Sequence, residues 1–458
     1  MILQDMFGCD VTVSGKSTLD PWNRTLKGFL SHAGSTGPDL VATIEHDEQF
    51  ALAQASKGLF SLLLGRRELD KAIIAAHQAA VRSDQENPVT ERERHFINAL
   101  GAWINGKQTL AIQEMECVLE KWPHDPLAMK MSHAIRFMLG DLKGMRSSLE
   151  NIMHVYGGHK AEGYFHGCYA FTLEETGDYE LAETRGRKAL ELAPDDAWGL
   201  HAVMHVFDMT GRATEGLAWI NGKDAAWEHC NNFRYHVWWH IALMHLDLGN
   251  YEKVLELYDE YIRKDKTDDY RDISNATSVL LRLEFEGIET GNRWEELASL
   301  SSRRTQDNCV AFADLHYMMA LCKAPQKDAA SILLSNMNTS AEKKHHCEFS
   351  AAIKHPGVLA AQGLEAFRDN DFALAFECLA KARPKLQDIG GSHAQRDIFE
   401  RLAIESAMRA GLPNQAKNLL QERDLHRGHR DGYSDNRWAM LEHAKNDLIN
   451  DIGSYGAA

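Results

Sequence analysis

The 458-residue sequence lacks the features that mark several common classes of protein. It holds no run of about 18 or more apolar residues, so it predicts no transmembrane helix and no membrane partner. The N-terminal segment MILQDMFGCDVTVSG has neither the basic region nor the apolar core of a signal peptide. The eight cysteines are scattered without paired spacing, which is typical of free thiols in a reducing compartment. We therefore expect a cytoplasmic protein.

An excess of basic residues is also missing. The chain carries 50 Lys and Arg against 66 Asp and Glu, which gives a formal net charge of −16. Because binding to a phosphate backbone needs a basic surface, the composition predicts no nucleic-acid partner. The sequence contains no P-loop, GxGxxG, GxSxG or HExxH motif, so no motif indicates a reaction class.

What is present is a helical repeat, clearest between residues 163 and 196. The stretch GYFHGCYAFTLEETGDYELAETRGRKALELAPDD has two amphipathic segments on either side of Gly177. Ala182 and Ala189 place small residues where paired helices touch, and Pro194 follows the second segment. The pattern starts again at Ala197, one period of about 34 residues later. These features are those of a tetratricopeptide (TPR) repeat.

The same spacing can be followed through most of the chain. Aligning the turn glycines gives further units that begin near residues 51, 92, 126, 235, 356 and 397, with degenerate units between 291 and 334. We expect an all-α, TPR-like α-α superhelical solenoid of roughly nine to ten helical hairpins over residues 46–458. Residues 1–45 are expected to form an irregular N-terminal extension with one short helix. The segment 345–347 interrupts the array and is expected to be a loop or junction.

The repeat register places a group of histidines on one surface. In TPR arrays the first helix of each hairpin lines the concave groove, with repeat positions 2, 5, 9 and 12 on the exposed stripe. His201, His205 and Asp208 take positions 5, 9 and 12 of one repeat. His236 takes position 2 of the next repeat, and His240 lies at the edge of the groove. Two HxxxH pairs should therefore lie on neighbouring parallel helices.

Two interpretations of these histidines remain open. Two histidines spaced i, i+4 can bind one transition metal, and two such pairs could complete a site for Zn, Fe or Cu. Alternatively, the histidines are polar groove lining that binds a peptide carboxylate or hydrogen-bonds to neighbouring aromatic residues. The second interpretation is the more frequent outcome for histidines in a repeat groove.

Other polar residues are candidates for the same groove. Tyr164 takes position 2 of its repeat. Asp314 and His316 offer a carboxylate and an imidazole, although residues two apart on a helix do not face each other. Near the C-terminus, GGSHAQRD predicts a helix cap followed by Gln395, Arg396 and Asp397. Arg396 could bind a carboxylate or phosphate, or form a salt bridge to Asp397 or to a neighbouring helix.

Several segments together resemble one known family, that of tetratricopeptide repeat protein 38. The matching segments are LAMKMSHAIRFMLGD (127–141), the aromatic run at 164–171, DAWGLHAVMHVFDM (196–209), HVWWHIAL (236–243) with GNYE (249–252), RWEE (293–296), DLHYMMA (314–320) and GGSHAQRD (390–397). The resemblance runs from about residue 20 to the C-terminal region and implies a cytosolic, all-helical solenoid. It implies no established activity. It marks His133, His201, His205, His236, His240, Asp314, His316, Gln395, Arg396 and Asp397 as residues within the shared motifs.

The sequence thus supports two functional hypotheses. The first is a binding protein whose concave, His- and Arg-lined groove holds a peptide, a protein segment or a small anionic molecule. The second is a metal-dependent or acid/base enzyme whose pocket is built from His201, His205, His236, His240 and Arg396. A shallow open groove would favour the first, and a deep pocket with convergent polar groups would favour the second. The exposed end hairpins of a solenoid could also pair to form a homodimer.

Overall fold

A computed structural model describes residues 1–323, 327–343 and 347–455, without the side chains of 327, 343 and 444–455. Residues 345 and 346 of the expected loop at 345–347 lie outside the described residues. The helix pairs are α1 (Leu19–Ser31) and α2 (Thr36–His46), α3 (Ala51–Leu62) and α4 (Asp70–Glu86), α5 (Glu91–Ile104) and α6 (Gln108–Lys121), α7 (Pro126–Met138) and α8 (Leu142–Ile152), α9 (Glu162–Glu175) and α10 (Tyr179–Leu192), α11 (Ala197–Met209) and α12 (Ala213–Ile220), α13 (Phe233–Asp247) and α14 (Tyr251–Leu257), α15 (Tyr270–Phe285) and α16 (Arg293–Ser302), α17 (Ala311–Lys323) and α18 (Lys327–Lys343), α20 (Val358–Arg368) and α21 (Phe372–Ala382), and α22 (His393–Arg409) and α23 (Pro413–Arg427).

The remaining elements are short or terminal. They are the strands β1 (Ile2–Gln4) and β2 (Asp10–Thr12), the helices α19 (Glu348–Ala352) and α24 (Gly432–Tyr455), and the short 3-10 or π-helical segments η1 (Lys16–Thr18), η2 (Arg67–Leu69), η3 (Met153–Val155), η4 (Asp224–Ala226), η5 (Tyr258–Ile262), η6 (Ile353–Gly357) and η7 (Arg383–Ile389). From α3 onward, ten successive helix pairs can be followed in the described residues. The prediction of an all-α, TPR-like solenoid of nine to ten hairpins is confirmed.

The α9–α11 region shows why the sequence folds into hairpins. Gly177 has φ +85°, a left-handed conformation that favours glycine, and it reverses the chain between α9 and α10. Ala182 and Ala189 are fully buried on α10, where small side chains let the helices approach closely. At Gly186 a Cβ atom would come within 2.5 Å of Val203 on α11. Small residues at these contacts therefore set the spacing between successive helices.

Residues 1–45 are more ordered than the sequence predicted. β1 and β2 form an antiparallel hairpin in which Leu3 lies opposite Val11. The segment that follows forms two helices, α1 and α2, rather than one short helix. Trp22 on α1 is fully buried and its ring contacts that of Phe50 at 5.0 Å, edge to face. The N-terminal segment is therefore packed onto the first repeat.

The superhelix closes on itself, because its C-terminal repeats contact the inner ends of its N-terminal repeats. Arg66, after α3, contacts Asp268, before α15, at 2.6 Å. Gln387 of η7 donates a hydrogen bond to the carbonyl of Gly140 at 2.7 Å, where α7 ends. Thr109 on α6 reaches Glu348 on α19 at 2.6 Å. These contacts join segments that are more than 200 residues apart in the sequence.

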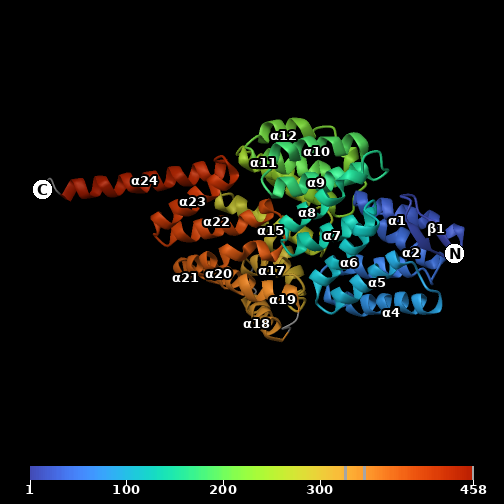
Figure 1. Cartoon of the computed structure of the whole chain (residues 1–458). Helices are drawn as coiled ribbons and strands as arrows, with labels where there is room; N and C mark the ends of the chain where they lie inside the picture. The colour runs from blue at the N-terminus through green and yellow to red at the C-terminus, as the bar shows by residue number, and fades with distance from the viewer. Residues whose placement is uncertain (324–326, 344–346, 456–458) are drawn as a thin grey trace.

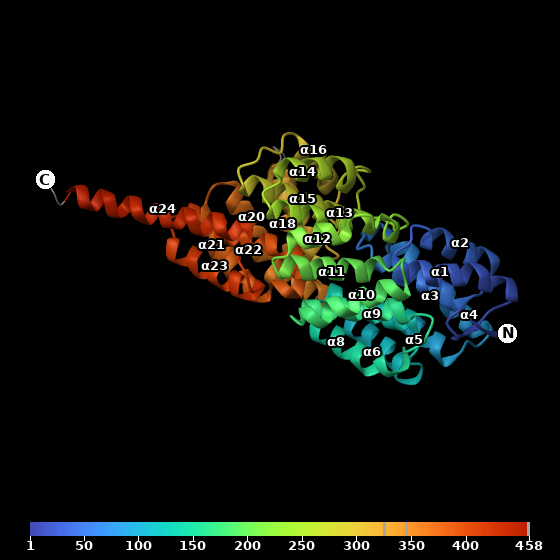
Figure 2. The same ribbon diagram turned by 90° about the horizontal axis from the view of Figure 1, so that it is seen from above.

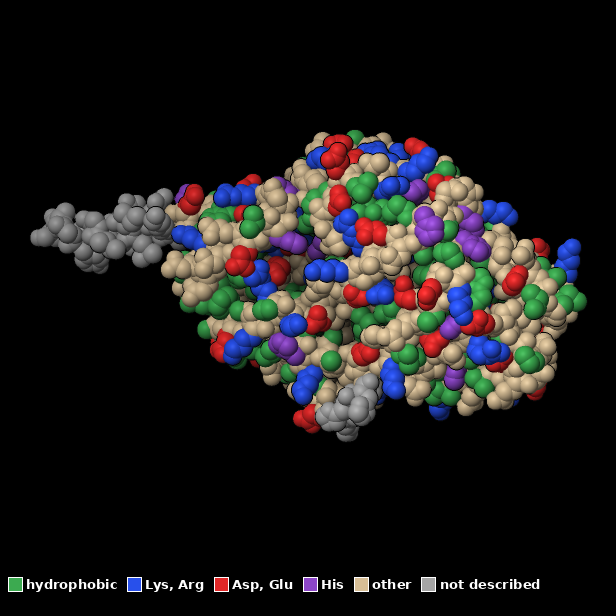
Figure 3. Space-filling view, viewed as in Figure 1, with side chains coloured by type: hydrophobic (Ala, Val, Ile, Leu, Met, Phe, Trp, Pro, Cys, Tyr) green, Lys and Arg blue, Asp and Glu red, His purple; other side chains and the backbone are tan. Residues whose placement is uncertain are grey.

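The figures show the resulting arrangement. α9 to α12 lie together at the top of the molecule, and α24 projects from the other helices at the end opposite the N-terminus (Figure 1). The view from above shows the first and last repeats on either side of the central helices (Figure 2). Acidic and basic side chains are intermixed over the face seen in Figure 3. On that face the negative net charge is spread over the surface rather than gathered into one patch.

Candidate functional site

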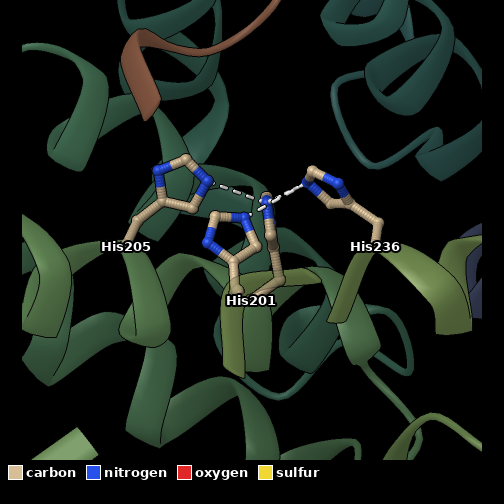
Figure 4. A group of neighbouring side chains, drawn as sticks. His201, His205 and His236 are labelled. Atoms are coloured by element: carbon tan, nitrogen blue, oxygen red, sulfur yellow. Dashed lines mark hydrogen bonds between the residues drawn. The ribbon is translucent and has the colours of Figure 1, made fainter. Parts of the chain in front are cut away.

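The four histidines predicted to face the groove come together in the structure. His201 and His205 lie on α11, and His236 and His240 lie on α13. One ring nitrogen from each lies within 4.8 Å of the others. Figure 4 shows the rings of His201, His205 and His236 turned toward one another, with their nitrogens at the centre. We call these four residues the histidine tetrad.

The tetrad has more nitrogen contacts than hydrogen bonding can satisfy. The Nε2 atom of His201 is 2.9 Å from Nε2 of His205 and 3.1 Å from Nε2 of His236. The Nε2 atom of His236 is in turn 3.2 Å from that of His240. In a neutral imidazole, each Nε2 offers either one N–H or one lone pair in the ring plane. Four such atoms can form two hydrogen bonds, whereas the structure has three close contacts.

A shared cation would account for this surplus. Four nitrogens bound at about 2.1 Å to one tetrahedral ion lie about 3.4 Å apart, close to the separations in the tetrad. Burial lowers the pKa of His236 to about 3. It also lowers the pKa values of His201 and His240 well below the usual range. These three imidazoles are therefore neutral near pH 7, the form that binds a metal.

A group outside the tetrad orients one of its rings, and a second group lies close to another. The Nδ1 atom of His236 is 2.9 Å from Oδ1 of Asn275 on α15. This oxygen acceptor at Nδ1 favours the tautomer whose lone pair is on Nε2, the nitrogen that faces the other histidines, as in metal-binding histidines. The Nδ1 atom of His205 is 3.3 Å from Oε2 of Glu174 on α9, a buried contact without hydrogen-bond geometry.

A second group of ionisable residues adjoins the tetrad but has a different character. Glu174, Glu175, His205 and His393 also bring their ligand atoms within 4.8 Å of one another. Nε2 of His393 lies 2.5 Å from Oε1 of Glu174. Burial lowers the pKa of His393, but the charges of Glu174 and Glu175 outweigh it and raise the pKa to about 9. His393 and Glu174 therefore form a buried ion pair in this structure.

A large cavity adjoins one side of the tetrad. Its volume is about 470 Å³, within the range of small-molecule sites. It lies inside the closed superhelix, and its wall includes residues of α1, α3, α7, α9, α11, α13, α15 and α17. Six of its aromatic wall residues come from six different helices: Phe29, Phe60, Phe137, Phe171, Trp198 and Phe233. The cavity is thus built by the curvature of the whole array rather than by one repeat.

The tetrad meets this cavity through two of its members. His201 and His236 line the cavity, whereas His205 and His240 are not among its wall residues. His236 is only partly buried, whereas His205 and His240 are almost completely covered. An ion held by the tetrad would therefore be approached from the cavity side.

Asp208 and Asp397, also predicted for the groove, belong to another cluster. Oδ1 of Asp208 accepts a hydrogen bond from Arg427 at 3.0 Å. Asp397 accepts hydrogen bonds from Arg423 and Arg401, each at 2.7 Å. We call the buried residues Asp397, Arg401, Arg423 and Asp431 the arginine–aspartate network. Its members are held by one another and do not line the large cavity.

The other predicted residues are dispersed. The Tyr164 hydroxyl donates to Asp195 at 2.8 Å, and Tyr164 is not among the cavity residues. Asp314 is buried, and burial raises its pKa to about 8. His316 Nδ1 lies 2.7 Å from the carbonyl of Phe312, so Asp314 and His316 form no dyad with each other.

The predicted residues near the start of α22 are divided between the cavity and an ion pair. Gln395 lines the cavity and caps α22 through a capping box with Ser392. Arg396 hydrogen-bonds to the carbonyl of Gly391 and lies 3.6 Å from Glu175 on α9. Its partner is therefore a carboxylate of a neighbouring helix, one of the alternatives left open by the sequence.

Three residues of the site were not identified from the sequence. Glu174 takes position 12 and Lys130 position 5 of their repeats, so both lie on the stripe that identified the histidines. Asn275 lies on the next first helix after His236. Applying the stripe to every polar residue of every repeat, rather than to a few of them, would have found Glu174 and Lys130.

Comparison with known proteins gives limited information. No family model matches the chain. Among solved structures, the human IFIT1 dimer with PPP-AAAA matches over 92% of this chain and 97% of that chain, at 13% identity and a TM-score of 0.40. Yeast Tom70 matches over 95% and 96%, at 13% identity and a TM-score of 0.34. Likenesses at these TM-scores transfer no ligand or partner to this chain. Among the described residues, no helix is both long enough and apolar enough to cross a membrane.

Proposed function

We propose that this repeat protein binds one transition-metal ion through the histidine tetrad and holds a small ligand next to it in the cavity. The observation that carries the proposal is the convergence of four imidazoles, three of them buried, with three close Nε2 contacts, beside a cavity of about 470 Å³ that two of them line. Imidazole donors suit Zn, Cu, Fe and Ni. The closed superhelix also favours a small ligand over an extended peptide in an open groove.

This proposal combines both hypotheses from the sequence. The protein remains a repeat-based binding protein, and the tetrad supplies the metal site of the enzyme alternative. Arg396 is not part of the site, because it is engaged by Glu175 and Gly391. The resemblance to the tetratricopeptide repeat protein 38 family, the cytoplasmic location, the homodimer and the absence of a nucleic-acid partner stay predictions.

The test is a titration of metal-free protein with Co²⁺, followed by visible absorption. The wild type should bind one equivalent and develop the absorption bands of Co²⁺ in a nitrogen-ligand site. The His201→Ala/His236→Ala variant should remain folded, judged by circular dichroism and thermal unfolding, and should show no such bands.

His316→Gln is the matched control, because His316 is a buried histidine outside the tetrad. It should bind Co²⁺ as the wild type does. Absence of a saturable site in the wild type, or an unchanged spectrum in the folded double variant, would contradict the proposal. Loss of the fold in the double variant would instead show that the tetrad is structural.

A further inference from the structure

The cavity contains a buried cation that lacks a close counter-ion. Lys130 on α7 lines the cavity and is only 4% exposed. Its Nζ lies 4.7 Å from the ring centre of Trp198 and 3.7 Å from Sγ of Cys168. Within the described part of the chain, no carboxylate oxygen lies within 4.0 Å of this ammonium group. A buried ammonium with only a thiol and an aromatic face as partners carries a large desolvation cost.

The other charged groups nearby do not supply that counter-ion. Asp196 feels the charge of Lys130, but its Oδ2 atom accepts a hydrogen bond from the backbone of Gly199 at 3.2 Å, where it caps α11. Burial raises the pKa of Asp196 to about 7, and the charge of Lys130 opposes that shift. Arg271, another cation of the cavity wall, is already paired with Asp269 at 2.6 Å.

An apolar wall extends from Lys130 toward the tetrad. The Trp198 ring, which Lys130 contacts, has its centre 5.0 Å from that of His201. Phe233 lies against both Trp198 and His201, at 5.5 and 5.3 Å between ring centres. Phe29 and Phe60, which also line the cavity, are stacked at 4.2 Å. A ligand between these surfaces would have an apolar body with one end at Lys130 and the other near His201.

We propose that the cavity binds an organic monocarboxylate with an apolar body, whose carboxylate pairs with Lys130. The inference rests on the proposed function, because the end of this ligand away from Lys130 would face the proposed metal site. A carboxylate fits better than a phosphate because one ammonium balances one negative charge, whereas a phosphate would demand several donors. Among the described residues, Lys130 is the one buried cation of the cavity wall without a carboxylate close to it. The ligand's carboxylate would neutralise it.

The experiment compares ligands that differ only in their charged end. Octanoate, decanoate and 4-phenylbutyrate are each titrated calorimetrically against their matching alcohols, with octyl phosphate as a further arm. The protein variants are wild type, Lys130→Met, Lys130→Arg and, as a surface control, Lys188→Met on the outer helix α10. Each is also measured in the His201→Ala/His236→Ala background.

We expect carboxylates to bind the wild type about 10- to 100-fold more tightly than their alcohols, the effect of a charge-assisted hydrogen bond. The preference should vanish in Lys130→Met and persist in Lys130→Arg and Lys188→Met. Equal binding of acids and alcohols by the wild type would overturn the inference, as would a preference that survives in folded Lys130→Met. Tighter binding of octyl phosphate than of octanoate would overturn the choice of carboxylate.

The two proposals can fail separately. If the acid preference persists in the double histidine variant but no metal binds to the wild type, the carboxylate site stands and the metal site falls. If metal binds to the wild type but acids bind no more tightly than alcohols, the metal site stands and the carboxylate site falls. Should Lys130→Met fail to fold, the comparison of acid with alcohol in the wild type and in Lys130→Arg decides the question.

Discussion

The histidine tetrad and the arginine–aspartate network are both buried polar clusters, but they are satisfied in opposite ways. In the network, Arg423 contacts Asp397 at 2.7 Å and Asp431 at 2.5 Å, so opposite charges lie together. The tetrad has no such internal balance, because its nitrogens make three close contacts where hydrogen bonding allows two. The network therefore balances its own charges, although Nη1 of Arg401 has no hydrogen-bond partner among the described residues, whereas the tetrad leaves one of its close nitrogen contacts without a hydrogen bond.

The spaces beside the two clusters differ accordingly. The cavity next to the network is about 20 Å³, room for about one water molecule. The cavity next to the tetrad is about 470 Å³. Burial of polar groups alone therefore does not mark a functional site. Incomplete satisfaction together with adjoining space distinguishes the tetrad, and the two clusters should respond differently to substitution.

The largest effect on stability is expected in the network. Arg423→Met removes the guanidinium shared by Asp397 and Asp431 and leaves buried carboxylates poorly compensated. We expect a loss of about 3 kcal/mol or more in the free energy of unfolding, measured by urea denaturation. Arg409, an exposed residue that pairs with Glu405, supplies the control: Arg409→Met should cost about 1 kcal/mol or less, because Arg437 still binds Glu405. Folded Arg423→Met should bind Co²⁺ normally, and a loss of binding would show that the clusters are coupled.

An effect on metal affinity is expected at Glu174, with some loss of stability because Glu174 also pairs with the His393 cation. Glu174→Gln keeps the shape of the side chain but removes the negative charge 3.3 Å from Nδ1 of His205. Loss of such an outer contact typically costs about 10- to 100-fold in metal affinity. Competition with a chelator would measure it. Glu175→Gln is the control, because Glu175 contacts the backbone N–H of His393 and the Arg396 side chain. Equal affinities in the two variants would contradict the role given to Glu174.

A smaller effect of the same kind is expected at Asn275. Asn275→Leu removes the acceptor 2.9 Å from Nδ1 of His236 and frees that ring to change tautomer. We expect a loss of about 10-fold in metal affinity in the same chelator assay. Ser274→Ala, on the adjacent residue, removes a hydroxyl that bonds only within its own helix, to the carbonyl of Tyr270, and should have no effect. An Asn275→Leu affinity equal to that of wild type would remove Asn275 from the site.

The smallest expected effect is on how the free energy of unfolding changes at low pH, and it comes from Asp397 of the network. Burial would raise the pKa of Asp397, but Arg423 and Arg401 outweigh it and hold the pKa well below its usual range. As pH falls below about 4, the unfolded chain takes up a proton that folded Asp397 does not, so this stabilisation declines. The difference in unfolding free energy between wild type and Asp397→Asn should therefore narrow from pH 5 to pH 3, by at most about 1.4 kcal/mol per pH unit. A constant difference would show that Asp397 is not held ionised by its arginines.

The sequence predicted the local part of this site and missed the long-range part. The 3.6-residue period and the repeat register placed His201, His205, His236 and His240 together. They could do so because the four histidines lie on the first helices of two neighbouring repeats. The same register could not show that α17 and α22 return to close the cavity, since contacts such as Gln387 to Gly140 join distant repeats. The sequence assigned Asp397 to the groove because the repeat register does not show which side chains meet when the last repeats pack. In the structure Asp397 instead contacts Arg423, which also binds Asp431.

The most direct test of the central claim is the metal content of the purified protein, without an affinity tag, by elemental analysis. The account predicts about one equivalent of Zn, Cu, Fe or Ni in the wild type and none in the folded His201→Ala/His236→Ala variant. A wild type that holds no metal after anaerobic reconstitution with each of these ions would contradict it and leave the histidines as cavity lining.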